Sequence, residues 1–211
     1  MVEKLFLVKR VTHSAHDAPK SVTATEKEQG IHKLVEESLF LIGRDKNADA
    51  SLGDCKEFSR VHSAVKVLRD EKGALVPFLL DLNPKNSSLV TVGRVKKKSP
   101  KIVDMPVSDA LKAELRLALK TRDVESVREL VARVPNEIFL KHGVKLALND
   151  SVNYITKQLV GEGIGEKEFY RRLEAGEFIP FITISQSFKL VAKPSWLARL
   201  KFFVKKKFGG R

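Results

Sequence analysis

Cysteine is nearly absent from this chain of 211 residues, since Cys55 is the only one. An internal disulfide is therefore excluded, which favours a reducing compartment. The chain also lacks an apolar run approaching roughly 18 residues, the length that a membrane-spanning helix needs. Its N-terminus lacks the long apolar core of a signal peptide. These absences predict a cytosolic or nuclear protein with no membrane partner, and the motifs described below favour the nucleus.

The motifs of common enzyme classes are missing as well. The sequence has no Gly-x-x-x-x-Gly-Lys run, no Gly-x-Ser-x-Gly turn and no group of Cys, His and carboxylate residues at metal-ligand spacing. The glycine-rich stretch from Gly161 to Gly165 lacks the strand-to-helix context of a dinucleotide site. We therefore expect a protein that is not an enzyme and that uses no cofactor and no metal.

Acidic residues are missing from the end of the chain, where eight lysines and arginines follow Glu177. The formal net charge is +13. Such a charge predicts an acidic partner, either a phosphorylated protein or a nucleic acid, DNA or RNA. The alternative is a solvated basic surface that binds nothing specific. The candidate nucleic-acid contacts are Lys96, Lys97, Lys98, Lys205, Lys206 and Lys207.

Two apolar runs are each followed at once by polar residues, a pattern typical of buried strands that end in surface loops. Leu39–Ile42 is followed by Gly43-Arg44, and Phe78–Leu80 is followed by a polar loop. A third polar run, from Ser59 to His62, precedes an alternating strand. If these loops meet at one end of a β-sandwich, their guanidinium and hydroxyl groups suit a dianionic phosphate.

This ordered set of motifs resembles the forkhead-associated (FHA) domain, a β-sandwich that binds phosphothreonine peptides. The family pattern is a Gly-Arg pair, then Ser-x-x-His, then an Asp-Leu-x-Ser-x-Asn-Gly-Thr loop. In this chain the first two elements are intact, but Ser87 stands in place of the Gly and Ser88 in place of the Thr. The alternative is an FHA scaffold that has lost phosphopeptide binding.

The resemblance implies roles for particular residues. The residues expected to bind the phosphopeptide are Arg44, Ser59, Arg60 and Asn86. The residues expected to be structural parts of the motif are Gly43, His62 and Asp81.

The hydrophobic pattern changes near Thr121. Apolar residues from Val124 to Val134 recur at helical spacing behind Asp123, a good N-cap, and this predicts a helix that ends before Pro135. A second helix is predicted over Glu166–Ala175. We therefore expect two domains and a tail: an all-β FHA-like sandwich over residues 1–120, a smaller α/β domain over 121–208, and a tail over 209–211.

Three segments have less regular patterns. The polar stretch from His13 to Gln29 predicts a long loop. Residues 110–119 fit a helix through Leu111, Leu115 and Ala118 but also alternate as a strand, and the FHA comparison favours the strand. Extended structure is expected at residues 138–140, and residues 178–188 are expected to be an insertion.

The predicted order of helices and strands after Thr121, with a late Pro194-Ser195-Trp196-Leu197, resembles a BRCT domain. The resemblance implies structural roles for Gly176 and Trp196. The nearest candidates for a second phosphate site are Thr121 and Lys167. The alternative is an unrelated α/β domain in which Trp196 is a core residue.

An FHA module followed by a BRCT-like module resembles the organisation of phosphopeptide-binding adaptors in DNA double-strand-break repair. This resemblance implies a nuclear adaptor that recruits phosphorylated partners, among them subunits of a repair nuclease complex. The alternative is a spliceosome-associated FHA protein whose basic segments contact RNA. The context of Leu41-Ile42-Gly43-Arg44 with Ala48-Asp49 resembles that group.

Overall fold

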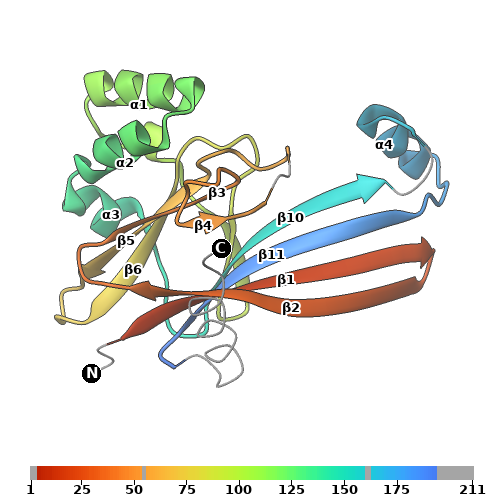
Figure 1. Cartoon of the computed structure of the whole chain (residues 1–211), viewed down its shortest axis with the longest axis horizontal. Coiled ribbons are helices and arrows are strands. Elements are labelled where there is room, and N and C mark those ends of the chain that lie inside the picture. Colours follow the sequence, from red (N-terminus) through yellow and green to blue (C-terminus); the bar gives the residue numbers. More distant parts are fainter. Residues whose placement is uncertain (1–3, 54–55, 160–162, 194–211) are drawn as a thin grey trace, which may run out of the picture.

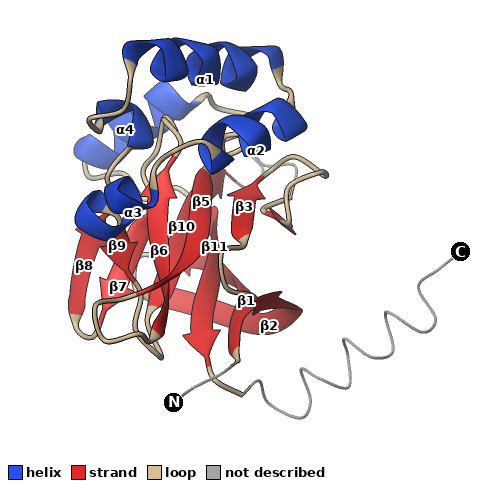
Figure 2. Cartoon of the chain, turned by 90° about the vertical axis from the view of Figure 1, so that its left-hand side faces the viewer, coloured by secondary structure: helices blue, strands red, loops and turns tan. Residues whose placement is uncertain are grey.

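The computed structural model describes residues 4–53, 56–159 and 163–193, which form three layers. A layer of helices covers a five-stranded sheet, and the other face of that sheet packs on a six-stranded sheet (Figures 1 and 2). The prediction of a mixed fold containing a two-sheet sandwich is therefore confirmed. The sandwich was expected to belong to an all-β module, but a layer of helices covers one of its sheets.

The five-stranded sheet has the order β4-β3-β5-β6-β9. Its two central strands form a hairpin in which nearly every side chain is buried, as expected for apolar strands covered on both faces. This confirms the strand predicted after His62 and the buried strand predicted at Phe78–Leu80. The strands are β3 (Leu39–Gly43), β4 (Ala50–Ser51), β5 (Ser63–Arg69), β6 (Leu75–Asp81) and β9 (Val144–Lys145).

The six-stranded sheet has the order β2-β1-β11-β10-β7-β8, and strands β1, β2, β10 and β11 extend far beyond the helical layer (Figure 1). Its strands are β1 (Leu5–Ala18), β2 (Ser21–Leu34), β7 (Leu89–Val92), β8 (Val95–Lys98), β10 (Ser151–Leu159) and β11 (Phe181–Val191).

The hairpin of β1 and β2 replaces the loop predicted from His13 to Gln29, so that prediction was wrong. The first half of β2 is exposed and polar, and it is an edge strand. Backbone pairing with β1 holds it in place without an apolar face, which is why hydrophobic periodicity gave no strand signal.

Three helices cover the five-stranded sheet: α1 (Asp109–Thr121), α2 (Val124–Ala132) and α3 (Asn136–His142). The strand favoured over residues 110–119 was wrong. The helical spacing was the correct signal, because Leu111, Leu115 and Ala118 are buried and Ser108 caps the helix. The predicted helix behind Asp123 is confirmed as α2, since the Asp123 carboxylate accepts a hydrogen bond from the Ser126 N–H at 3.0 Å.

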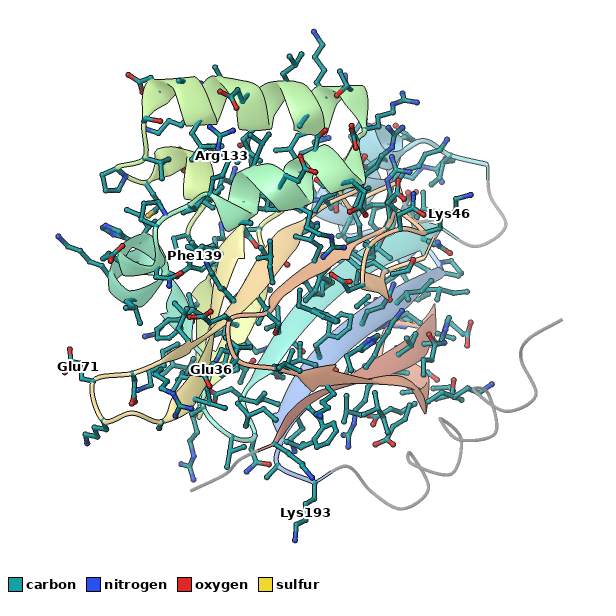
Figure 3. The ribbon with its side chains drawn as sticks, turned by 60° about the vertical axis from the view of Figure 1, so that its left-hand side comes forward. Glu36, Lys46, Glu71, Arg133, Phe139 and Lys193 are labelled. Carbon is teal, nitrogen blue, oxygen red and sulfur yellow. The ribbon has the colours of Figure 1, made fainter. Side chains whose placement is uncertain are left out.

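The extended segment predicted at residues 138–140 was also wrong, because these residues belong to α3. A short helix can hide within an apolar triplet, and here Phe139 is fully buried between α3 and the sheet (Figure 3). The Lys66 ammonium nitrogen lies 5.3 Å from the centre of its ring. A single 3₁₀ turn, η1 (Ile102–Asp104), precedes α1.

The helix predicted over 166–175 is confirmed as α4 (Glu166–Glu174), with Gly176 just beyond its end at a φ of 80°. Phe169 of α4 packs on Phe181 at the far end of the six-stranded sheet, with ring centres 5.8 Å apart. Trp196, Lys205, Lys206, Lys207 and the tail 209–211 lie outside the described residues.

The structure has no domain boundary between residues 120 and 121. Strand β11 pairs with β1 from Phe6↔Val191 to His16↔Phe181, and β10 pairs with β7. Residues 178–188, expected to be an insertion, supply most of β11. The described residues after 121 therefore complete the sandwich begun by the N-terminal half, and the prediction of a separate BRCT-like domain there was wrong.

Candidate functional site

The Gly43-Arg44 and Ser59-to-His62 motifs lie side by side at one end of the five-stranded sheet. The Arg44 N–H donates to the Ser59 carbonyl at 3.0 Å, and the Asp45 N–H donates to the Arg60 carbonyl at 3.1 Å. The His62 N–H donates to the Ile42 carbonyl at 2.8 Å. Backbone bonds of the sheet thus continue into the loops and bring Arg44 next to Ser59 and Arg60.

Gly43 makes this close approach possible. A Cβ atom added at Gly43 would lie 1.8 Å from the Arg60 carbonyl oxygen and 2.8 Å from the Cα of Val61. Both are backbone atoms, so neither can rotate away as a side chain would. The residue before Arg44 must therefore be glycine for the two loops to lie this close together.

Substituting Gly43 by alanine should separate these loops. We expect Gly43→Ala to lower the free energy of unfolding by at least about 3 kcal/mol, the upper end for overpacking, because the clash is with backbone. Urea denaturation measures this loss. Gly165→Ala is the matched control, because its Cβ would meet nothing within 4 Å. Equal stability of the two variants would contradict the close approach.

A cavity of about 320 Å³ opens where these loops meet helix α1. Arg44, Ser59 and Arg60 line it from the sheet side. From the helix side and the loop after β6 come residues that the sequence analysis did not select: Asn83, Arg116, Lys120 and Arg122. The helical alternative for residues 110–119 contained the missing signal, because Arg116 and Lys120 are four residues apart and share one face of a helix.

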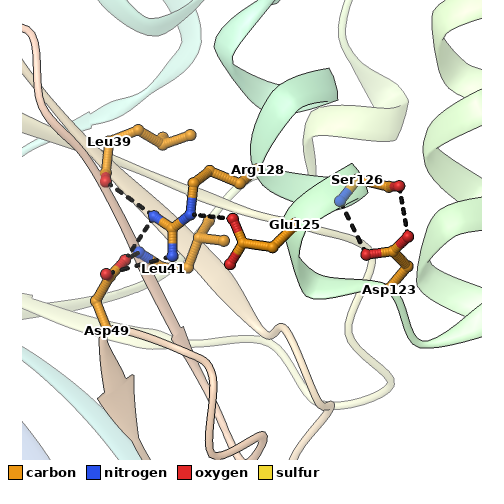
Figure 4. Close-up of polar contacts among 7 residues, drawn as sticks. All are labelled: Leu39, Leu41, Asp49, Asp123, Glu125, Ser126 and Arg128. Carbon is orange, nitrogen blue, oxygen red and sulfur yellow. Dashed lines mark hydrogen bonds and ion pairs between the residues drawn. The ribbon is translucent and has the colours of Figure 1, made fainter.

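The cavity holds uncompensated positive charge. None of its five cationic side chains forms an ion pair with a residue in the described part of the chain: Arg44, Arg60, Arg116, Lys120 and Arg122. The one carboxylate in the lining, Asp123, accepts hydrogen bonds from Ser126 at the start of α2 (Figure 4).

The cations are close enough to affect one another. The pKa of the Arg60 guanidinium lies below its ordinary value because of desolvation and because Arg122 and Arg44 place like charges near it, while the nearby Asp45 carboxylate offsets part of this effect. A bound anion relieves repulsion of this kind, because an opposite charge nearby favours the charged form of each cation. The electrostatics therefore favour an anionic ligand.

A second hollow of about 520 Å³ adjoins the cavity and shares Arg44 and Arg60 with it. Its other side is the loop from Asp45 to Gly53, on which Lys46 points outward (Figure 3). This loop is fixed by Asp49, whose carboxylate accepts bonds from the Leu41 N–H at 2.7 Å and from Arg128 of α2 at 2.9 Å (Figure 4). The two hollows form a continuous surface on both sides of Arg44 and Arg60.

Asn86 was expected to bind the peptide, but its side chain supports the loop that precedes Ser59. Its side-chain amide donates to the Glu57 carbonyl at 3.1 Å, and it does not line either hollow. His62 also supports this loop, because its Nδ1 accepts a bond from the Ser59 N–H at 3.3 Å. Both residues therefore hold the Ser59 loop in position, and neither lines the cavity or the second hollow.

A buried polar cluster lies beneath the site. The Ser63 hydroxyl is 2.5 Å from the Tyr154 hydroxyl, which joins the two sheets. Asp81 accepts bonds from the Ser88 N–H at 2.9 Å and from the Ser88 hydroxyl at 2.5 Å. Ser88 stands where the FHA pattern has Thr. Its hydroxyl is hydrogen-bonded within the core and does not line the cavity.

Burial shifts the pKa values of two groups in this region, His62 and Asp81, in opposite directions. Burial lowers the pKa of His62 to about 4, and burial raises the pKa of Asp81 to about 6. As the pH falls from 6.5 to 4, the unfolded chain protonates His62 before the folded chain does, which costs up to about 3 kcal/mol of stability. As the pH falls from 6 to 3.8, the folded chain protonates Asp81 first, which adds up to about 3 kcal/mol.

The two effects nearly cancel in the wild type, and removing either group should expose the other. As the pH falls from 6.5 to 4, we expect the free energy of unfolding of His62→Asn to rise relative to that of the wild type. The free energy of unfolding of Asp81→Asn should fall relative to the wild type over the same range. Urea denaturation at several pH values measures both differences. Parallel pH profiles for the three proteins would show that neither group has the shifted pKa.

The remaining candidates do not form a second phosphate site. The Thr121 hydroxyl donates to the Leu117 and Ala118 carbonyls of its own helix. Lys167 lies on α4, at the opposite end of the molecule from α1 (Figure 1). Prediction of a joint site at these two residues was therefore wrong, because they are not brought together. Lys96, Lys97 and Lys98 lie exposed on β8 and do not line the cavity.

Two negative findings concern other classes of site. Among the described residues no group of three or more His, Cys, Asp or Glu side chains is placed to hold a metal ion. The helices of the same residues include none that is long and apolar enough to span a membrane.

No protein-family model matches the sequence, and no curated protein matches it. A solved structure described as "Engineered FHA with Myc-pTBD peptide" matches 84% of this chain and 90% of its own, with 12% identity and a TM-score of 0.30. A TM-score of this size supports no statement about a shared fold or ligand.

Proposed function

We propose that this protein binds a phosphothreonine-containing segment of a partner protein in the cavity between the Arg44 and Ser59 loops and helix α1. The supporting observation is the group of unpaired cations beside the Ser59 hydroxyl in a cavity of about 320 Å³. The Arg44 guanidinium and the Ser59 hydroxyl contact the phosphate, and Arg60 adds charge. Hydrogen bonds of this charge-assisted kind contribute about 1.5–3 kcal/mol each.

The shape of the surface favours a peptide. The second hollow lies between Arg44 and Arg60 and the loop from Asp45 to Gly53, and it adjoins the cavity, so an extended segment has space on both sides of its phosphate. A duplex or long RNA would need a row of cations along the surface. The three exposed lysines of β8 are consecutive strand residues whose side chains alternate between the two faces of the sheet, so they form no such row, and none of them lines the cavity.

Titration calorimetry with a phosphothreonine peptide and its unphosphorylated twin tests the proposal. Because the partner sequence is unknown, a degenerate peptide library with one fixed phosphothreonine is the probe. We expect binding of the phosphorylated library alone. Equal binding of both libraries, or of neither, would remove the phosphopeptide function, and tighter binding of single-stranded RNA or DNA would favour the nucleic-acid alternative.

We also propose a biological setting: a nuclear adaptor without catalytic activity that recruits phosphorylated DNA double-strand-break repair factors, as in nibrin. The proposed phosphate site and the net charge of +13 support this role, whereas the pairing of β10 and β11 with the N-terminal strands removes part of the likeness on which it was based. The alternative setting is RNA processing. Co-purification from native cells distinguishes them by recovering either repair nuclease subunits or splicing factors.

A further inference from the structure

Helix α1 places a second group of cations in the cavity, opposite the Arg44 loop. Arg116 and Lys120 are four residues apart on α1, and Arg122 follows at its C-terminal cap. Like Arg44 and Arg60, these three side chains have no ion-pair partner among the described residues. The cavity therefore has two cationic sides, one from the sheet loops and one from α1.

Arg122 has an unusual backbone conformation for an arginine. Its φ of 78° and ψ of 22° place it in the left-handed region, where glycine or asparagine is favoured. The cap is otherwise regular, because the Arg122 N–H donates to the Ala118 carbonyl at 3.0 Å. An unfavourable residue at a helix cap is often retained for function, and here the arginine side chain lines the cavity.

The charge of a single phosphothreonine does not match this lining. A phosphothreonine carries about −1.5 to −2 at neutral pH. The lining holds five cations and one carboxylate, and that carboxylate already accepts bonds from Ser126 at the start of α2. Arg44 and Arg60 balance one phosphate, which leaves the α1 side uncompensated.

We propose that the cavity binds two phosphate groups of one doubly phosphorylated segment: a phosphothreonine at Arg44, Ser59 and Arg60, and a second phosphate at Arg116, Lys120 and Arg122. This inference rests on the proposed function and adds its substrate class. The α1 cations thus select for a neighbouring phosphorylation, and partner binding depends on two modification events.

The test uses libraries with one fixed phosphothreonine and a second phosphoserine at varied short spacings, compared with libraries that lack the second phosphate. We expect at least one spacing to bind wild-type protein at least tenfold more tightly than the singly phosphorylated library. Glutamate in place of the phosphoserine should recover only part of this gain, because a carboxylate carries less charge.

Arg122→Gly is the decisive variant, because glycine suits the left-handed cap and the fold should be at least as stable as wild type. We expect it to lose most of the gain from the second phosphate while it binds the singly phosphorylated library within about twofold of wild type. Lys96→Gln is the matched control, since it removes one exposed cation outside the cavity, and it should retain the gain.

The outcomes separate this inference from the proposed function. Absence of binding to either phosphorylated library would contradict both. Equal binding of the singly and doubly phosphorylated libraries would contradict the second phosphate alone. A gain that survives in Arg122→Gly and in Lys120→Gln would place the second phosphate elsewhere and would also overturn the inference.

Discussion

Arg44→Gln is expected to weaken phosphothreonine-peptide binding by about 100-fold. The substitution removes the charge and the forked donor that two charge-assisted bonds to phosphate need, and a loss of about 3 kcal/mol corresponds to that factor. Among the described residues Arg44 has no ion pair, and its buried Nε has no hydrogen-bond partner. The folded protein therefore loses little when the guanidinium is removed.

Calorimetry and thermal melting of the same samples measure both parts of this prediction. Arg44→Lys should lie between wild type and Arg44→Gln, because lysine keeps the charge but not the bidentate geometry. Arg69→Gln is the matched control, since Arg69 is paired with Glu36 outside the cavity, and its binding should be unchanged. A large drop in melting temperature for Arg44→Gln would instead identify Arg44 as a structural residue.

Removing β10 and β11 is expected to unfold the sandwich. A fragment of residues 1–148 loses four large side chains buried between the sheets: Val152, Tyr154, Phe188 and Leu190. At about 1.5–3 kcal/mol for each, their burial is comparable with the whole stability of a domain, about 5–15 kcal/mol. The fragment also lacks the two strands that connect β1 to β7 in the six-stranded sheet, because β11 pairs with β1 and β10 pairs with β7.

Circular dichroism and proton NMR of the fragment, beside the full chain, test this expectation. We predict no cooperative melting transition for residues 1–148. Addition of a peptide of residues 149–211 should restore part of the transition, which identifies the missing strands as the cause. A fragment that melts cooperatively on its own would restore the division into two domains that the strand pairing contradicts.

The parts of the fold that the sequence predicted correctly are those with local signals. The hairpin of β5 and β6 has apolar strands on both sides of a polar turn, and α2 has an N-cap followed by helical spacing. The errors in the six-stranded sheet came from strand pairings that no local pattern shows. Hydrophobic periodicity does not show that β11 pairs with β1, nor that an exposed, polar β2 is held in place by the backbone of its neighbour.

The candidate site was predicted in the same way. The order of the motifs along the chain predicted that Arg44 lies next to Ser59 and Arg60, and the structure places all three in one cavity. The α1 side was missed because residues 110–119 were interpreted as a strand. Once they form a helix, Leu115 and Ala118 turn into the core, and Arg116 and Lys120 are left facing the cavity.

The central claim is that phosphate enters the cavity beside Arg44. Amide NMR spectra of the full chain, recorded during titration with the phosphothreonine library and with its unphosphorylated twin, test it most directly. We predict that only the phosphorylated library shifts signals, and that the largest shifts belong to Arg44, Ser59 and Arg60. Shifts centred on the lysines of β8, or identical spectra with both libraries, would contradict the claim.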